Sequence, residues 1–316
     1  MHNPILEGKN LSKSYTDFES GKSLKACRDV DFYINKGETV GIVGESGCGK
    51  STLLKMLAKL ESPTEGELFF ENNNITNIKG RDLKEHRKNI QMVFQDPSTA
   101  FSPRMKVDDC LLEPIENFYK LSKKDKKNKV NELLEQVELP TDYANRYCHA
   151  MSGGQRQRLG IARALSLDPQ ILVCDEATSA LDVSIQKNII DLLVDIQRKR
   201  DLSIIFVCHD ISLVASFTHR IMIMYLGTVV ETLNSCDLQQ KACHPYSKLL
   251  ISSIFSTSMD FNKKIEILEG DVPSPLDIPL GCPFSSRCSS CMDICTKEKP
   301  SLKQLSNNHK VACHLF

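Results

Sequence analysis

The chain has 316 residues, of which 41% are hydrophobic and 25% are charged, so it can bury a core and is not a disordered protein. Forty Lys and Arg residues balance forty Asp and Glu residues, which leaves no overall charge to attract nucleic acid or an acidic membrane. No apolar run approaches the roughly 18 residues of a spanning helix. Residues 1–20 lack a signal-peptide pattern, so we expect neither a membrane span nor secretion.

Strand-like and helix-like segments alternate along the chain. Residues 39–43 (TVGIV) are a short apolar run before a glycine, which is typical of a buried strand, and residues 50–60 have helical periodicity. Residues 171–174 and 203–207 are further buried-strand candidates, separated by an amphipathic helix at 185–199. This order predicts a parallel α/β sheet, which usually binds nucleotides at the carboxyl ends of its strands.

The middle and the end of the chain differ from this pattern. Residues 97–167 contain no strand-like run but have helical patterns at 107–119 and 123–137, so we predict a mostly helical insertion. Its lysine-rich segment, KKDKKNK, is interpreted as a solvated helix face. After about residue 256 the composition shifts to Pro, Ser and Cys, which indicates a separate C-terminal extension.

A glycine-rich segment lies between the first predicted strand and helix. Residues 44–51 (GESGCGKS) match G-x-x-x-x-G-K-[ST], the phosphate-binding P-loop. Glycines allow backbone N–H groups to turn toward phosphate oxygens, and the helix N-terminus adds a favourable dipole. Lys50 is expected to reach the β- and γ-phosphates and Ser51 to bind Mg²⁺. The predicted nucleotide-binding residues here are Gly44, Glu45, Ser46, Gly47, Cys48, Gly49, Lys50, Ser51 and Thr52.

The predicted strand at 171–174 is followed by two carboxylates. Asp175 is placed to hold the magnesium shell, and Glu176 is placed to polarise the attacking water. The alternative is that the two acids only cap the helix that follows.

Further motifs lie before, between and after the P-loop and the two carboxylates. Residues 151–155 (MSGGQ) resemble the LSGGQ signature of ATP-binding-cassette (ABC) proteins, with Met151 in place of the usual Leu. Residues 179–182 (SALD) resemble the D-loop of that family. Gln95 matches its Q-loop, His209 its switch histidine and Tyr15 the aromatic residue that stacks on adenine. A lone Gln or His is usually structural, but the ordered set favours the functional interpretation.

The resemblance implies an ABC ATPase domain that spans residues 1–256. This domain would contain a RecA-like P-loop NTPase core, an antiparallel β part and a helical ABC subdomain. Two such subunits would bind two ATP molecules at a shared interface. The signature residues of one subunit (Ser152, Gly153, Gly154 and Gln155) would face the nucleotide held by the other. Glu176, His209 and Gln95 would be the catalytic residues, and Ser51, Gln95 and Asp175 would surround Mg²⁺.

Three segments resemble one branch of the family, the oligopeptide, dipeptide and nickel importers. Residues 96–104 (DPSTAFSPR) resemble D-P-x-x-S-L-N-P-R, with departures at residues 100–102. Residues 244–254 (HPYSKLLISSI) resemble H-P-Y-T-x-x-L-L-x-S-I-P, with Phe255 in place of the final Pro. Residues 281–288, Cys295 and residues 311–314 resemble the branch's cysteine-rich extension, which would comprise residues 257–316. The resemblance implies peptide import, with nickel or metal-chelate import as the alternative, and a soluble non-transport ABC ATPase as the other class. It also implies a second ATPase subunit in a heterodimer, two permeases, an extracytoplasmic binding protein and a peripheral position on the cytoplasmic face of the membrane, without nucleic acid.

Five of the thirteen cysteines lie in the last 35 residues. Because a reducing compartment disfavours disulfides, a metal site is the leading use of this cluster. Cys282, Cys288, Cys295 and Cys313 are spaced C-x5-C-x6-C-x17-C, with Cys291 in addition. Four thiolates can hold a 4Fe-4S cluster or a zinc ion. The resemblance implies the 4Fe-4S cluster, and zinc or free cysteines remain the alternatives.

Overall fold

The computed structural model describes residues 4–16, 23–95, 101–102, 104–179, 181–252, 273–274, 276 and 278–316. The chain divides into two compact units. The first comprises residues 1–34, 39–77 and 207–316, and the second comprises residues 35–38 and 78–206.

The first unit contains an antiparallel sheet with the strand order β2-β1-β4-β5. The strands are β1 (Leu6–Thr16), β2 (Ser23–Ile34), β4 (Glu65–Phe70) and β5 (Asn73–Asn74). Leu6 and Gly8 of β1 are buried and Glu7 between them is partly exposed, the alternation expected of a sheet with one covered face. This sheet is the antiparallel part that the family resemblance implies.

The strands of a second sheet in this unit follow the order β11-β12-β10-β9-β3. They are β3 (Thr39–Val43), β9 (Arg220–Tyr225), β10 (Thr228–Asn234), β11 (Lys303–Ser306) and β12 (His309–Val311). Strand β3 matches its prediction and is buried along its whole length. It pairs in parallel with β9, whereas the pairs β9–β10, β10–β12 and β12–β11 are antiparallel.

Helix α1 (Lys50–Leu57) follows β3 and is shorter than the predicted 50–60. It ends because Lys59 has a left-handed backbone, φ 52°, which an α-helix cannot continue. The other helical elements of the first unit are α8 (Ile211–Phe217), α9 (Leu238–Lys241), α10 (Pro245–Ser252), α11 (Asp293–Lys297) and the 3₁₀ turns Ser235–Asp237 and Ser285–Arg287.

The described part of the C-terminal extension is joined to the first unit. Strand β12 pairs with β10 through Glu231 opposite Val311 and Thr232 opposite Lys310. The fully buried ring of Phe284 packs edge-on against Tyr225, with ring centroids 5.2 Å apart. The extension therefore shares the core of this unit. Burial of a Phe side chain contributes about 2–3 kcal/mol to stability. The boundary predicted near residue 256 lies outside the described residues.

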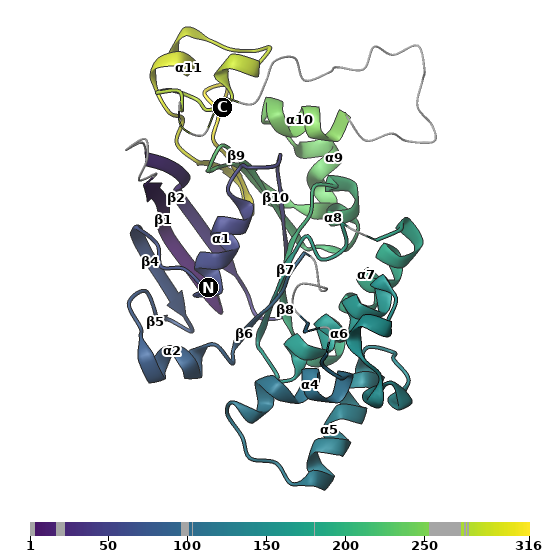
Figure 1. The fold of residues 1–316 in the computed structure, drawn as a ribbon. Coiled ribbons are helices and arrows are strands. Elements are labelled where there is room, and N and C mark those ends of the chain that lie inside the picture. The colour runs from purple at the N-terminus through teal and green to yellow at the C-terminus, as the bar shows by residue number, and fades with distance from the viewer. Residues whose placement is uncertain are drawn as a thin grey trace. The chain divides into compact units, whose positions relative to one another are not determined.

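The second unit contains three strands in the order β8-β7-β6 and a group of helices (Figure 1). The strands are β6 (Ile90–Val93), β7 (Ile171–Asp175) and β8 (Ser203–Val207), the last residue of β8 being assigned to the first unit. The helices are α2 (Gly80–His86), α4 (Val107–Glu116), α5 (Lys123–Gln136), α6 (Gly153–Leu165) and α7 (Val183–Arg200). Strands β6 and β7 are parallel, as the α/β prediction requires.

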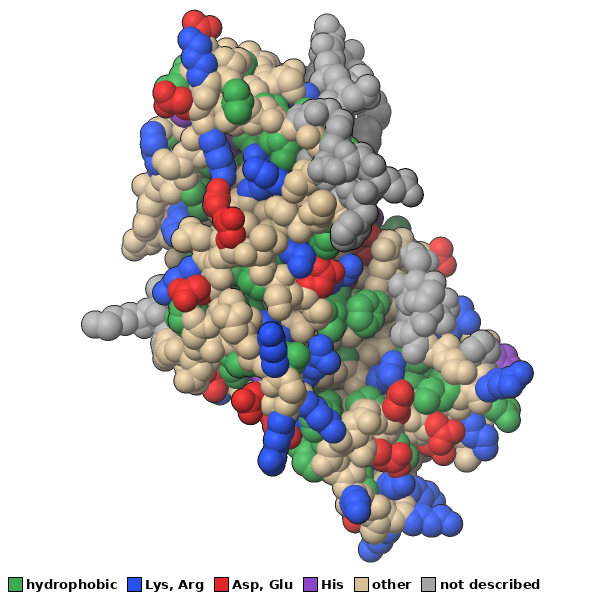
Figure 2. Space-filling view, turned by 60° about the vertical axis from the view of Figure 1, so that its left-hand side comes forward, with side chains coloured by type: hydrophobic (Ala, Val, Ile, Leu, Met, Phe, Trp, Pro, Cys, Tyr) green, Lys and Arg blue, Asp and Glu red, His purple; other side chains and the backbone are tan. Residues whose placement is uncertain are grey.

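The helical insertion is confirmed for the described residues between 101 and 167. They form α4, α5, α6 and two 3₁₀ turns (Thr141–Asn145 and Cys148–Ala150), and their only β pairing is an isolated bridge from Lys106 to Tyr147. Lys and Arg side chains cover the outer surface of the molecule over α5, and on the face shown they are interspersed with acidic groups (Figure 2). This helix has the solvated face that was expected, and its Lys126 also pairs with Glu116. Within the described ranges, no helix is both long enough and apolar enough to cross a membrane.

Candidate nucleotide site and its attached cysteine extension

The P-loop connects β3 to α1 in the first unit. Lys50 is 5% exposed, and its Nζ donates to the carbonyl oxygens of Gly44 at 2.7 Å and of Glu45 at 2.9 Å. Gly49 has φ 101°, and a Cβ there would collide with the Ala26 carbonyl oxygen of β2. Ser46 and Ser51 are exposed beside the buried lysine. The loop therefore folds around a buried ammonium group and presents hydroxyl groups to solvent.

Tyr15 lies beside the start of α1. Its hydroxyl donates to Glu61 Oε2 at 2.5 Å, and its side chain also hydrogen-bonds to Thr52. Partial burial, followed by the Glu61 carboxylate, raises the pKa of Tyr15, so the phenol stays protonated at neutral pH. An aromatic ring is thus held next to the P-loop, in the same unit.

His209 is exposed and follows β8 directly. The preceding residue, Cys208, donates its N–H to the Ile42 carbonyl oxygen of β3 at 3.4 Å. The next residue, Asp210, caps α8 by accepting from the N–H groups of Ser212 and Leu213 at 2.8 and 3.1 Å. The histidine is therefore fixed on both sides, beside the strand that enters the P-loop.

In the second unit, Gln95 and the two acids follow neighbouring strands. Val93 of β6 is paired in parallel with Cys174 of β7, so Gln95 and Asp175 leave the same edge of the sheet. Glu176 has φ 48°, an uncommon conformation for a residue with a side chain. The Ser179 N–H and hydroxyl both donate to its carbonyl oxygen, at 3.1 and 3.0 Å, and hold this turn.

The start of the helix that follows this turn shows whether Asp175 and Glu176 only cap it. The following helix, α7, begins at Val183, and its N-cap residue is Asp182. Asp175 and Glu176 therefore do not cap it, and the capping interpretation is wrong.

The signature segment starts α6 with a reciprocal capping box. Ser152 Oγ accepts from the Gln155 N–H at 3.3 Å, and Gln155 Oε1 accepts from the Ser152 N–H at 3.0 Å. A Cβ on Gly154 would lie 2.8 Å from Ile185 Cγ2 of α7, so a larger residue would push the two helices apart. Met151 is buried, consistent with an apolar exchange for Leu. The S-x-x-Q spacing could have predicted this box from the sequence.

The structure thus divides the predicted site residues between the units. Tyr15, residues 44–52, His209 and the cysteines of the extension belong to the first unit, whereas Gln95, Ser152, Gly153, Gly154, Gln155, Asp175 and Glu176 belong to the second.

Glu45 of the P-loop is held by residues from two distant segments, which the sequence did not predict. Its N–H donates to the Tyr246 hydroxyl at 2.9 Å. Its carboxylate accepts two bonds from Arg287, Nη1 to Oε2 at 2.8 Å and Nη2 to Oε1 at 3.1 Å. Arg287 also donates to the Tyr225 hydroxyl at 3.2 Å, and hydrogen bonding to Glu45 is the main cause that raises its pKa. The loop is therefore connected to the H-P-Y segment and to the cysteine extension.

His244 of the same H-P-Y segment orients Tyr246. Its Nδ1 accepts from the Tyr246 N–H at 3.1 Å, and burial lowers its pKa to about 4, so the ring is neutral and can accept. The rings of Tyr246, Tyr225 and Phe284 pack together, with centroids 4.8 to 5.3 Å apart.

A Tyr246→Phe variant should be less stable than wild type by about 1 kcal/mol, because the Glu45 N–H loses its partner while the aromatic packing stays. Urea unfolding of the purified chain measures this difference. Tyr147→Phe, at an exposed ring, is the matched control and should unfold like wild type. Equal stability of Tyr246→Phe and wild type would show that this bond does not hold the loop.

The four cysteines of the predicted quartet gather in the extension. Every pair among Cys282, Cys288, Cys295 and Cys313 is close enough to interact electrostatically. Burial, and then these neighbours, raise the pKa of Cys282 to about 11. The Cys282 N–H donates to the Cys295 carbonyl oxygen at 2.7 Å, which fixes two of the four segments. Cys291 is exposed and interacts with Cys288 and Cys295.

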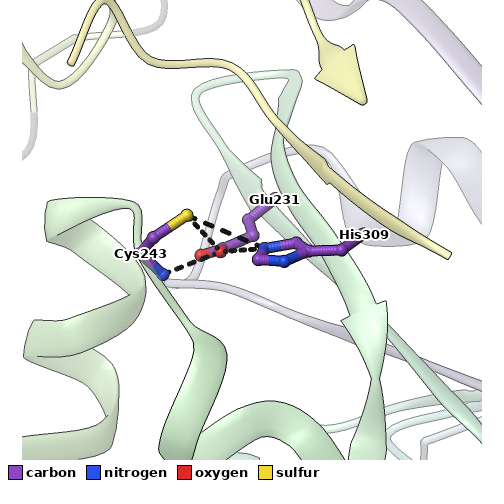
Figure 3. Close-up of side chains that lie close together, drawn as sticks. All are labelled: Glu231, Cys243 and His309. Atoms are coloured by element: carbon purple, nitrogen blue, oxygen red, sulfur yellow. Dashed lines mark hydrogen bonds and ion pairs between the residues drawn. The ribbon is translucent and has the colours of Figure 1, made fainter. Parts of the chain in front are cut away.

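A second cluster, which the sequence did not predict, lies close to this quartet. Glu231 of β10, Cys243 before α10 and His309 of β12 bring their side chains together (Figure 3). Glu231 is fully buried, and its Oε1 lies 2.8 Å from His309 Nε2 and 3.2 Å from Cys243 Sγ.

A buried P-loop lysine, a strand ending in two acids and a signature helix start are the parts of an ABC ATPase. A model of the ABC transporter family matches residues 27–179, and a model of the oligopeptide/dipeptide transporter C-terminal region matches residues 230–295. The chain is 42% identical over 299 residues to the oligopeptide transport ATP-binding protein OppF of Haemophilus influenzae, covering 94% of this chain and 90% of that protein. It is 41% identical over 321 residues to the oligopeptide transport ATP-binding protein AppF of Bacillus subtilis, covering 99% and 97%.

Among solved structures, a dimer of the ATP-binding cassette MJ0796 with bound ADP and phosphate is similar, with a TM-score of 0.67 and 31% identity over 73% of this chain and 99% of that one. The chain therefore belongs to the ABC transporter family, and within it to the oligopeptide/dipeptide transporter ATP-binding proteins. It is an ATPase that uses ATP with Mg²⁺, and the family and fold predicted from the motifs are confirmed.

Proposed function

We propose that this chain hydrolyses ATP to drive the uptake of oligopeptides or dipeptides through partner permeases. The observation that carries the proposal is the attachment of the H-P-Y segment and the cysteine extension to the P-loop through Glu45. These two segments are the parts that distinguish the oligopeptide/dipeptide branch, and relatives of similar length are named as oligopeptide transport proteins.

The side chains of the predicted site are of the types that bind phosphate, Mg²⁺ and the attacking water. Lys50 would exchange its two carbonyl partners for β- and γ-phosphate oxygens. Ser51, Gln95 and Asp175 are the oxygen donors that would hold Mg²⁺, which neutralises phosphate charge when bound. Glu176 would orient and polarise the attacking water.

The remaining roles belong to groups around the phosphates. His209 would position the γ-phosphate, and Tyr15 would stack on adenine. Ser152, Gly153, Gly154 and Gln155 would meet the nucleotide of a second ATPase subunit, because an exposed helix N-terminus favours anions.

We further propose that Cys282, Cys288, Cys295 and Cys313 hold a 4Fe-4S cluster rather than zinc. The four thiols lie close enough to interact with one another, and four thiolates are the ligand set of such a cluster. The family resemblance favours the iron–sulfur cluster over zinc. The cluster would staple the extension and has no assigned catalytic step.

The proposed assembly contains this chain, a second similar ATPase subunit, two permeases and an extracytoplasmic binding protein. The chain would lie on the cytoplasmic face of the membrane, where the permeases provide the membrane spans.

Uptake in a strain that lacks this chain tests the proposal. Complementation with wild type should restore uptake of labelled dipeptide or oligopeptide, and Glu176→Gln should not restore it. Labelled nickel is the parallel arm, since nickel import is the second candidate. Restoration of nickel uptake without peptide uptake would reject the peptide assignment and leave the ATPase assignment intact.

A further inference from the structure

The cluster of Glu231, Cys243 and His309 combines three side chains that bind zinc. They come from β10, from the segment before α10 and from β12, so the cluster joins the ATPase sheet, the H-P-Y segment and the end of the extension (Figure 3). All three ligand atoms lie within 4.8 Å of one another. Carboxylate oxygen, thiolate sulfur and imidazole nitrogen are all zinc ligands in proteins.

The spacing of the three atoms is close to that of a zinc site. Glu231 Oε1 is 2.8 Å from His309 Nε2 and 3.2 Å from Cys243 Sγ, and Cys243 Sγ is 3.7 Å from His309 Nε2. Tetrahedral zinc places such ligand atoms about 3.3–3.6 Å apart. Shifts of at most about half an ångström would therefore admit the ion between them.

The carboxylate is also held by outer hydrogen bonds, as a metal ligand usually is. Glu231 Oε1 accepts from the Cys243 N–H at 2.8 Å, and Oε2 accepts from the His244 N–H at 3.1 Å. These bonds fix the carboxylate before any metal arrives, which lowers the cost of ordering a ligand on binding.

Charge and access also fit zinc. The Cys243 thiol, which donates to Glu231 Oε1, would release its proton to solvent when it binds zinc. The resulting thiolate, the carboxylate and an uncharged imidazole would together balance the divalent cation, so the ion would leave no net charge in a buried site. Glu231 and His309 are buried, whereas Cys243 is partly exposed, so we expect the ion and a water as fourth ligand to enter from the side of Cys243.

We propose that Glu231, Cys243 and His309 form a structural zinc site, distinct from the cysteine quartet, that holds β12 and the H-P-Y segment to β10. The site does not depend on the proposed transport function.

Metal analysis of the anaerobically purified full chain tests the site, with zinc, iron and sulfide measured on one sample after equilibration with zinc and dialysis. Wild type should hold about one zinc per chain. Cys243→Ser and His309→Gln should each weaken zinc binding more than about 100-fold, because even an outer-shell change weakens metal binding 10- to 100-fold. Their iron content should match that of wild type. Cys236→Ser, at an exposed cysteine outside the cluster, is the matched control.

Cys288→Ser separates the two sites. Zinc should persist in this variant, because Cys288 belongs only to the quartet. If Cys288→Ser loses the zinc while Cys243→Ser keeps it, the zinc lies in the quartet and the proposal is wrong. Wild type that holds no zinc after equilibration would leave Glu231 and His309 as a metal-free hydrogen-bonded pair and would equally overturn it. Because Cys243 is partly exposed, its Ser variant should fold even if His309→Gln does not.

Discussion

A Glu176→Gln variant is expected to hydrolyse ATP at least about 100-fold more slowly than wild type while still binding it, because the amide cannot accept a proton from the attacking water. The substitution keeps the size of the side chain, and the turn that gives Glu176 its left-handed backbone depends on backbone and Ser179 atoms. Phosphate release by the purified chain under Mg·ATP measures the rate. Glu135→Gln, on the exposed face of α5, is the matched control and should be unaffected.

With the proposed second ATPase subunit present, the same variant should accumulate as an ATP-bound dimer, because hydrolysis would be the step that reopens the closed pair of cassettes. Sedimentation with and without ATP detects it. Turnover near the wild-type rate would remove Glu176 from the catalytic role and leave the P-loop assignment standing.

An Arg287→Ala variant is expected to lose about 2 kcal/mol of stability and to bind Mg·ATP more weakly. Its guanidinium is almost fully buried and makes two charge-assisted bonds to Glu45, a residue of the P-loop itself. Removal leaves the partly buried Glu45 carboxylate without this partner and frees one side of the loop. Urea unfolding and nucleotide titration measure the two effects.

Two variants control for this effect. Arg287→Lys keeps the charge but loses the planar fork, so it should fall between wild type and Arg287→Ala. Lys299→Ala removes an exposed ion pair with Asp29 from the same extension and should change stability by less than about 1 kcal/mol. If Arg287→Ala unfolds and binds nucleotide like Lys299→Ala, the extension does not support the P-loop.

The elements that depend on local sequence were predicted well. Strands β3 and β8 match their predicted residues, and α7 extends its prediction by two residues at one end and one at the other. Short apolar runs, helical periodicity and the P-loop glycines each act within a few residues, so they can be read directly from the chain. Helix α1 was predicted too long because helical periodicity does not report the left-handed turn at Lys59.

The contacts that join distant segments could not be predicted. Glu45 and Arg287 are 242 residues apart, and nothing in either segment alone indicates that they meet. The same is true of β12 on β10, and of the cluster that places Cys243 beside His309. These pairings depend on how distant segments of the chain meet in the folded structure. One of them, Glu45 with Arg287, connects the extension to the P-loop.

The central claim is that the P-loop of this chain binds and hydrolyses Mg·ATP, and it is tested most directly by phosphate release from wild type, Lys50→Ala and Lys55→Ala. Lys50 is buried inside the loop, whereas Lys55 lies exposed on the same helix. We expect magnesium-dependent hydrolysis by wild type and Lys55→Ala, and a loss of about 100-fold or more in Lys50→Ala, since the lysine is the loop's charged contact to the β- and γ-phosphates. Hydrolysis by Lys50→Ala at the wild-type rate would contradict the account.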